Sequence, residues 1–195
     1  RFRVELDRDG GMELDLGPTE LLLIVFDRNR KGPQWQPLPL TGEPLVNIED
    51  WDVELHHARE SWTRKVRMQQ LQDLRNTEFV NFAGEVIYRT NFVVDRPAQH
   101  PVLNLGRVAG IAEVTLNGEP CGVRWCGRRL YDLTGKLREG ENLLEVKVTT
   151  TLGNYMRTLT DNDTAQKWVG GRKTQPEQSM GLIGPVSLYE NDRVV

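Results

Sequence analysis

The sequence predicts an all-β protein built as an antiparallel sandwich. Apolar and polar residues alternate with a period of two in several runs, which is typical of strands that bury one face. Turn residues separate these runs about every ten residues, and stretches with helical spacing are nearly absent. The chain has 195 residues, of which 38% are hydrophobic and 27% charged. This composition provides enough apolar residues for a core and an ordinary soluble surface.

The clearest alternation occurs in three runs, each with apolar side chains on one face and polar side chains on the other: 86–93, 111–117 and 143–149. Asn117-Gly118 separates the second run from another expected strand at Cys121–Trp125. Asn-Gly is a strong hairpin signal because both residues tolerate a positive φ.

Two segments depart from this pattern. Val66–Leu74 has loosely spaced apolar residues and is the one helix that we expect. Residues 152–181 are polar and irregular, and they include Trp168. A loop of this length in a compact domain is generally functional, disordered or packed on a partner.

A domain boundary is predicted near residue 45. Residues 2–26 read as a strand meander, and the next stretch carries four prolines around Trp35. Prolines at this density lack the N–H groups that a strand ladder needs. We therefore expect residues 1–45 to be the end of a neighbouring β unit with a proline-rich linker, and residues 46–195 to form the main sandwich. The start at Arg1, inside an expected strand and without a Met, suggests an excised fragment or a processed product.

Charge and hydropathy argue against two classes of partner. The formal net charge is −3, whereas nucleic acids and anionic membranes attract clustered positive potential. The longest apolar run, Leu21–Phe26, is far shorter than the roughly 20 residues that cross a bilayer. We expect neither a nucleic-acid nor a membrane partner.

The two cysteines are expected to be free thiols. Cys121 and Cys126 lie five residues apart on or beside an expected strand, so about 16 Å would separate them along it. A disulfide requires Cα atoms within about 7 Å of each other.

A series of short motifs resembles the galactose-binding-like jelly-roll domain of large glycoside hydrolases. The motif residues occur in the family's order: Phe82, Gly84, Tyr88 and Phe92; Leu103-Asn104-Leu105-Gly106-Arg107-Val108; Ala112, Val114 and Asn117-Gly118; Gly122 and Trp125; Asp132, Thr134, Leu137, Gly140, Asn142, Leu144, Val146 and Val148; and Gly181-Leu182-Ile183-Gly184-Pro185-Val186. The set resembles glycoside hydrolase family 2, and more closely the C-terminal module of the bacterial α-L-rhamnosidases of family 106.

The resemblance implies a galactose-binding-like jelly-roll sandwich without a catalytic site of its own. In those enzymes a separate domain carries catalysis. The expected function is therefore that of an accessory module packed on the catalytic domain of the same parent chain. An autonomous carbohydrate-binding module that recognises glycans is the alternative. The resemblance also suggests a secreted or periplasmic location.

No catalytic or metal-binding constellation emerges from the residue types, so we predict neither an enzyme nor a cofactor. His56 and His57 are adjacent on a probable strand and therefore face opposite ways, and no Ser lies in a nucleophile-elbow context. The Cys and His residues lack zinc spacing. Structural Ca²⁺ is considered at Asp161-Asn162-Asp163, where a plain solvated turn is the favoured interpretation.

Sugar recognition requires an aromatic platform with polar side chains that bond the hydroxyls. Such residues gather in one connecting segment and in the long polar segment, which gives these candidates for carbohydrate binding: Trp125, Arg128, Arg129, Tyr131 and Trp168. Packing is the competing interpretation for Trp125 and Tyr131. For Trp168 the competing interpretation is an interface with the catalytic domain.

Overall fold

The structure is a computed structural model that describes residues 8–11, 16–17, 19–21, 23, 25, 40, 42–96, 98–170 and 176–191. The strands expected between residues 2 and 26 and the proline-rich linker lie largely outside the described residues. The boundary near residue 45 therefore stays a prediction.

Strands dominate the described residues, which confirms the all-β fold class. They are β1 Val46–Ile48, β2 Trp51–His57, β3 Thr63–Met68, β4 Gly84–Val94, β5 Pro101–Asn104, β6 Arg107–Ala109, β7 Ile111–Leu116, β8 Glu119–Arg124, β9 Leu130–Asp132, β10 Gly140–Thr149, β11 Gly181–Gly184 and β12 Val186–Glu190. The helical elements are short: the 3-10 turn η1 Leu74–Asn76, α1 Gly153–Met156 and α2 Asp163–Val169.

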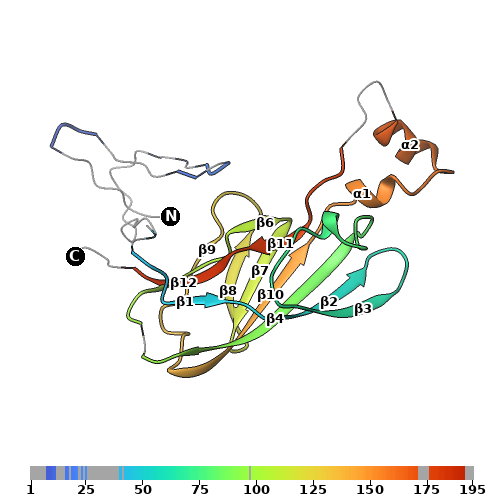
Figure 1. Cartoon of the computed structure of the whole chain (residues 1–195). Coiled ribbons are helices and arrows are strands. Elements are labelled where there is room, and N and C mark those ends of the chain that lie inside the picture. The colour runs from blue at the N-terminus through green and yellow to red at the C-terminus, as the bar shows by residue number, and fades with distance from the viewer. Residues whose placement is uncertain are drawn as a thin grey trace.

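The strands form two main sheets and one small one. The larger sheet has the order β3-β2-β4-β10-β7-β8, the second has the order β1-β12-β5-β9, and β11 pairs with β6. All the strand pairs are antiparallel. Figure 1 shows α1 and α2 at one end of the molecule, well away from β1 and β12.

Both main sheets contribute side chains to one hydrophobic core. Along β4, for example, the buried residues are every second one from Gly84 to Val94. Their partners in register on β10 include Leu144, Val146 and Val148, all fully buried. From the other sheet come Leu103 and Leu188, also buried. Period-two patterning thus gives the larger sheet an apolar inner face and a polar outer face.

The Asn117-Gly118 hairpin is confirmed. The two residues connect β7 to β8 with φ values of 52° and 83°, as a primed two-residue turn requires. The Asn117 side chain also donates to the Lys136 carbonyl at 3.2 Å and accepts from the Leu143 N–H at 3.0 Å. The turn is therefore tied to the start of β10.

The helix expected at Val66–Leu74 is wrong. Residues 63–68 form β3, which pairs with β2 and places Val66 opposite Val53. Alternation in Thr63–Met68 is weak because β3 is an edge strand and only Met68 is buried. Pairing with β2, a tertiary interaction, overrides the loose helical spacing.

The segment 152–181 contains two helices that the sequence reading missed. Asn154, in α1, is completely buried and bonds residue 178 twice, accepting from the Gln178 N–H at 2.7 Å and donating to its carbonyl at 2.9 Å. Asn162 caps α2 by accepting from the Ala165 N–H at 2.9 Å. Side-chain hydrogen bonds of this kind replace apolar anchors in a polar segment.

One buried carboxylate links η1 to β11. Asp73 Oδ1 accepts from the Arg75 N–H at 3.0 Å and from the Met180 N–H at 2.9 Å, and Oδ2 lies 3.5 Å from the Arg75 guanidinium. Burial by itself would raise the pKa of Asp73, but these hydrogen bonds and the Arg75 charge hold it below its ordinary value.

The larger sheet ends in β3 on one side and β8 on the other. Three of the six β3 residues are basic: Arg64, Lys65 and Arg67. β8 contains Pro120, and its pairing with β7 shifts register between Val114 and Thr115.

Within the described ranges, no helix is long and apolar enough to cross a membrane. Both cysteines are free, as expected. Burial is the main reason that the pKa of the Cys121 thiol is raised.

Candidate functional site

The segment between β8 and β9 holds three of the five predicted sugar-binding residues, and a fourth, Tyr131, lies in β9 itself. Arg129 is almost fully buried and its guanidinium donates to three backbone carbonyls: Trp125 at 3.0 Å, Gly127 at 3.1 Å and Gly110 at 3.3 Å. The Arg129 side chain thus joins two backbone groups of the segment to each other and to Gly110, which follows β6.

Tyr131 is buried as well, in β9. Its hydroxyl donates to the Ala112 carbonyl at 3.1 Å, and the Arg124 guanidinium lies 5.8 Å from its ring centre. Burial raises the pKa of Tyr131 to about 12. Tyr131 and Arg129, two of the predicted sugar contacts, thus hold the segment in place from inside, and little of either side chain is exposed.

Trp125 and Arg128 remain at the surface. The Trp125 side chain is 74% exposed. The Arg128 N–H donates to Glu20 Oε1 at 2.9 Å, its guanidinium lies 3.5 Å from Glu20 Oε2, and the Gly127 N–H donates to the Thr19 hydroxyl at 3.1 Å. Burial would raise the pKa of Glu20, but hydrogen bonds from Gly17 and Arg128 and the Arg128 charge lower it. We call these contacts the Glu20 clamp.

An apolar stretch follows the clamp in the sequence. Leu21 follows Glu20 directly and is 92% exposed, and two further apolar residues continue at a spacing of two. We define the apolar patch as these large exposed side chains: Leu21, Leu23, Val25, Val123 and Trp125.

Trp168 lies elsewhere. It belongs to α2, where its side chain is 51% exposed, and Figure 1 shows α2 far from β8 and β9. The fifth predicted residue therefore does not join the other four. Asn162, considered for Ca²⁺, uses its side-chain oxygen to cap α2. No group of three or more metal-ligating side chains occurs in the part of the chain that the structure describes.

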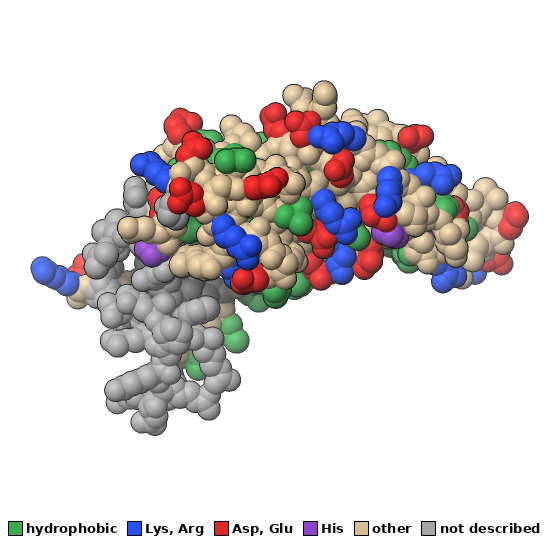
Figure 2. Space-filling model, turned by 90° about the horizontal axis from the view of Figure 1, so that it is seen from below, with side chains coloured by type: hydrophobic (Ala, Val, Ile, Leu, Met, Phe, Trp, Pro, Cys, Tyr) green, Lys and Arg blue, Asp and Glu red, His purple; other side chains and the backbone are tan. Residues whose placement is uncertain are grey.

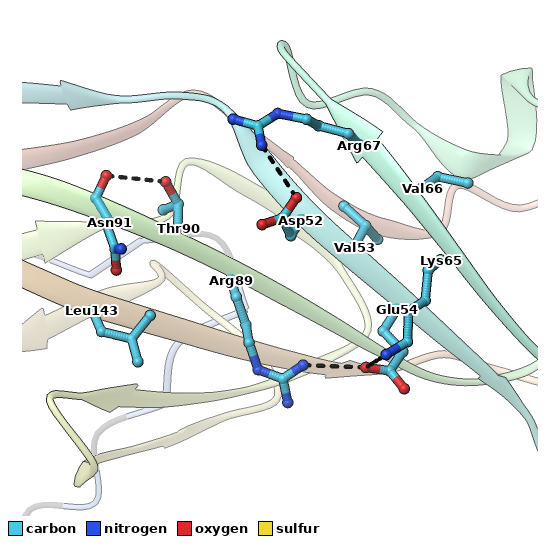
Figure 3. Close-up of a pocket in the computed structure, with 10 residues that line it drawn as sticks. All are labelled: Asp52, Val53, Glu54, Lys65, Val66, Arg67, Arg89, Thr90, Asn91 and Leu143. Atoms are coloured by element: carbon cyan, nitrogen blue, oxygen red, sulfur yellow. Dashed lines mark hydrogen bonds and ion pairs between the residues drawn. The ribbon is translucent and has the colours of Figure 1, made fainter.

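A groove on the outer face of the larger sheet is a feature that the sequence reading missed. It has a volume of about 540 Å³, and Figure 3 shows charged side chains from three neighbouring strands along it. Arg89 lies 2.7 Å from Glu145 and 3.3 Å from Glu54, and Lys65 lies 3.6 Å from Glu54. The groove could have been predicted from the alternating charged residues at 52 and 54 and at 65 and 67.

The charges in this groove are mutually paired. Desolvation would raise the pKa of Glu54, but the Lys65 charge and the Arg89 hydrogen bond lower it, so its carboxylate stays ionised at neutral pH. Acidic and basic side chains are interspersed in the same way on the face shown in Figure 2. A carboxylate with a lowered pKa is poorly suited to act as a general acid at neutral pH.

The two adjacent histidines face opposite ways. His56 Nε2 lies 3.2 Å from Glu54 on the outer face. His57 is buried, and its Nδ1 accepts from the N–H groups of Arg59 at 3.2 Å and Glu60 at 3.0 Å. Its ring packs against Trp62 and Tyr155 at centroid distances of 5.0 and 4.8 Å. His57 thus organises the turn between β2 and β3.

No family model matches the chain. A curated protein named "Putative beta-glucuronidase" from Formosa agariphila is 35% identical over 121 residues, which cover 58% of this chain and 10% of that protein. The relative is therefore far longer, and the match accounts for about a tenth of it.

Solved glycoside hydrolase structures contain the same fold. A rhamnosidase from Novosphingobium sp. PP1Y superposes with a TM-score of 0.61 at 24% identity, over 83% of this chain and 16% of that chain. A β-glucuronidase from Bifidobacterium dentium gives a TM-score of 0.54 at 21% identity, over 78% of this chain and 31% of that chain. The sandwich thus recurs as one part of longer glycoside hydrolase chains.

Proposed function

We propose that this chain is a non-catalytic accessory module of a bacterial, α-L-rhamnosidase-like glycoside hydrolase, and that it packs against a separate catalytic domain. The observation that carries the proposal is the apolar patch. Clustered exposed apolar side chains are uncommon on soluble monomers and typically mark an interaction surface. Trp is also enriched at the centres of protein interfaces.

The lengths of the relatives are consistent with the partner named in this proposal. The chain spans about a sixth of the rhamnosidase chain and a tenth of the curated relative. Most of each related enzyme is thus other protein, against which such a surface can be buried. The Glu20 clamp holds the residue before Leu21 against Arg128.

Substitutions in the patch test the docking. Trp125→Ser and Leu23→Ser should lower the Tm of the parent polypeptide by several degrees, because each removes an apolar contact with the catalytic domain. The Tm of the isolated chain should stay nearly unchanged. Val93→Ser is the matched control, since Val93 is a similarly exposed apolar residue on β4 outside the patch. Equal effects of Trp125→Ser and Val93→Ser would contradict the proposed surface.

The non-catalytic part of the proposal rests on the roles already taken by the titratable groups. Glu54 is ion-paired with Arg89 and Lys65, and His57 accepts two backbone hydrogen bonds. The isolated chain should therefore release no aryl group from aryl rhamnosides or aryl glucuronides. Turnover that survives repurification and disappears when one carboxylate is replaced would refute this.

An autonomous carbohydrate-binding module is the second candidate. The exposed indole of Trp125 favours it, because an aromatic face stacks on the apolar face of a pyranose. Calorimetry with rhamnose- and galactose-containing glycans tests it. Binding that Trp125→Ala abolishes while the Tm is unchanged would favour this function over docking.

A further inference from the structure

The side chain of Asn117 joins three segments of the sandwich: the turn between β7 and β8, the loop before β10, and β10 itself. Its Nδ2 donates to the Lys136 carbonyl at 3.2 Å and to Asn142 Oδ1 at 2.9 Å. Its Oδ1 accepts from the Leu143 N–H at 3.0 Å. The half-buried amide thus uses its N–H donors on acceptors inside the protein. We call this set of hydrogen bonds the amide junction.

Backbone groups fix the orientation of both amides in the junction. The Leu143 N–H can only donate, so the atom of Asn117 that faces it is the carbonyl oxygen. Asn142 is completely buried, and its Oδ1 accepts from the Arg138 N–H at 2.9 Å while its Nδ2 donates to the carbonyls of Arg138 and Gly140 at 2.8 and 3.0 Å. Turning either amide over would place donor against donor or acceptor against acceptor. Position 117 must therefore present N–H donors to both of its acceptors.

Asn117-Gly118 is also the only Asn-Gly pair in the chain. Asn side chains are among the thermolabile groups of proteins, and a following glycine has no side chain to shield its backbone nitrogen. Attack by the Gly118 nitrogen forms a bond to Asn117 Cγ and breaks the bond from Cγ to Nδ2. The amide nitrogen leaves as ammonia with the proton that the Gly118 nitrogen loses, and a succinimide ring remains. Water then opens the ring at either carbonyl, which yields Asp or isoaspartate.

The folded structure opposes this reaction. Attack makes Asn117 Cγ tetrahedral and expels Nδ2, so it destroys the planar amide that bonds its three partners. The turn is held through its backbone as well, since the Asn117 N–H donates to the Leu143 carbonyl at 2.9 Å. Attack therefore requires the turn to open, and local opening of a folded segment costs free energy. The unfolded chain carries no such restraint.

Neither product restores the junction. A carboxylate has acceptors and no donor, so at position 117 it would place an oxygen against the Lys136 carbonyl and another against Asn142 Oδ1. An acceptor that loses its donor is costly where water cannot replace the donor, and Asn142 is completely buried. Isoaspartate also adds a carbon to the backbone of a tight turn, and turn geometry sets the register of a hairpin.

We propose that Asn117 is a site of spontaneous deamidation, unreactive in the folded sandwich and reactive once the turn between β7 and β8 opens. Each converted chain loses the amide junction and folds back less stably, so time spent unfolded makes unfolding progressively irreversible. The proposal rests on the junction alone and is independent of the apolar patch and of any ligand.

Peptide mapping by mass spectrometry, with Asp and isoaspartate separated by chromatography, tests the site. The full chain is incubated at mildly alkaline pH with and without urea. Position 117 should convert readily in urea and at least about tenfold more slowly in the folded protein. In urea, Gly118→Ala should slow the conversion, because a methyl group shields the attacking nitrogen. Asn81, which precedes Phe82, is the internal control and should remain largely unconverted in urea over the same time.

Asn117→Asp reproduces one product directly. Its Tm should be lower than that of Asn117→Gly, which keeps the positive φ of the turn and removes the side chain, because only the carboxylate opposes the two acceptors. Asn81→Asp is the matched control, since the Asn81 side chain is exposed and makes no hydrogen bond among the described residues. The Tm of Asn81→Asp should match that of the wild type.

Refolding of the wild type gives a second measurement that needs no variant. After partial conversion in urea and dilution, converted chains should be depleted from the refolded fraction and enriched in the unfolded one. Equal conversion rates with and without urea, or no conversion in urea, would overturn the site. A Tm of Asn117→Asp at or above that of Asn117→Gly, or equal shares of converted chains in the two fractions, would overturn the loss of the junction.

Discussion

Buried polar side chains fix the backbone of this sandwich at single points. Arg129 donates to three carbonyls, and the Tyr88 hydroxyl accepts from the Leu182 N–H at 3.1 Å. Asn142 is completely buried and bonds the backbone of Arg138 and Gly140. Residue types suited to ligand recognition are thus used here to satisfy backbone groups, which must be paired when buried.

Tyr131→Phe tests this assignment. The change leaves the Ala112 carbonyl without its hydroxyl donor, and we expect the free energy of unfolding to fall by about 1–2 kcal/mol in urea denaturation. Binding of any saccharide should not change, because the ring stays buried. Normal stability together with lost binding would instead make Tyr131 a ligand contact.

At residue scale the sequence cannot separate Trp125 from Tyr131. Both are aromatic and flank the same short segment, yet one is exposed and the other buried. Trp125 lies just past the end of β8, where alternation no longer decides which way a side chain points. The turn at residues 117–118 was predictable because Asn and Gly both adopt the positive φ that this turn requires.

Elements far apart in the sequence depend on short polar links, and Asp73 makes the link between η1 and β11. Because its folded-state pKa is lowered, the folded protein binds fewer protons than the unfolded chain near that pKa. The carboxylate therefore stabilises the fold above the unfolded pKa of about 4, and this stability is lost as the pH falls through the folded pKa.

Asp73→Asn should remove this contribution. We expect the variant to be less stable than the wild type at neutral pH by about 2 kcal/mol, and the difference to shrink progressively below about pH 4. Urea unfolding at a series of pH values measures it. Asp52→Asn is the control, because that side chain is largely exposed. A difference independent of pH would mean that charge plays no part.

The strands with one buried face could be predicted from the sequence, whereas the edge strand β3 and the helices α1 and α2 could not. β4, β7 and β10 alternate clearly because neighbouring strands flank them in the larger sheet. β3 has a strand neighbour on one side only, and its basic residues interrupt the alternation of apolar and polar side chains. α1 and α2 bury few apolar side chains and are held by Asn154 and Asn162, and such bonds leave no periodicity.

Among the described residues, the Glu20 clamp joins the segment before residue 42 to the sandwich. A chain of residues 42–195 should retain the β-rich circular dichroism spectrum and lose no more than about 5 °C in Tm. Glu20→Ala in the full chain should reproduce that loss. Collapse of the spectrum on truncation would mean that residues 1–41 belong to the same folding unit.

The sandwich class follows from alternation and turn spacing, whereas its strand order does not. β2 and β10 both flank β4 although about 90 residues separate them in the chain, and period-two patterns say which face is buried but not which strand is adjacent. The candidate surfaces were harder still, since the groove of Figure 3 combines residues of β2, β3 and β4.

The two outer strands of the larger sheet carry a consequence for behaviour at high concentration. Open strand edges invite pairing with another chain, and from there fibrillar aggregation. β3 meets this hazard with Arg64, Lys65 and Arg67, which repel a second copy of the same strand. β8 meets it with Pro120 and the irregular pairing at Val114 and Thr115. Self-association of the isolated chain should therefore proceed through side chains of the apolar patch and remain reversible on dilution.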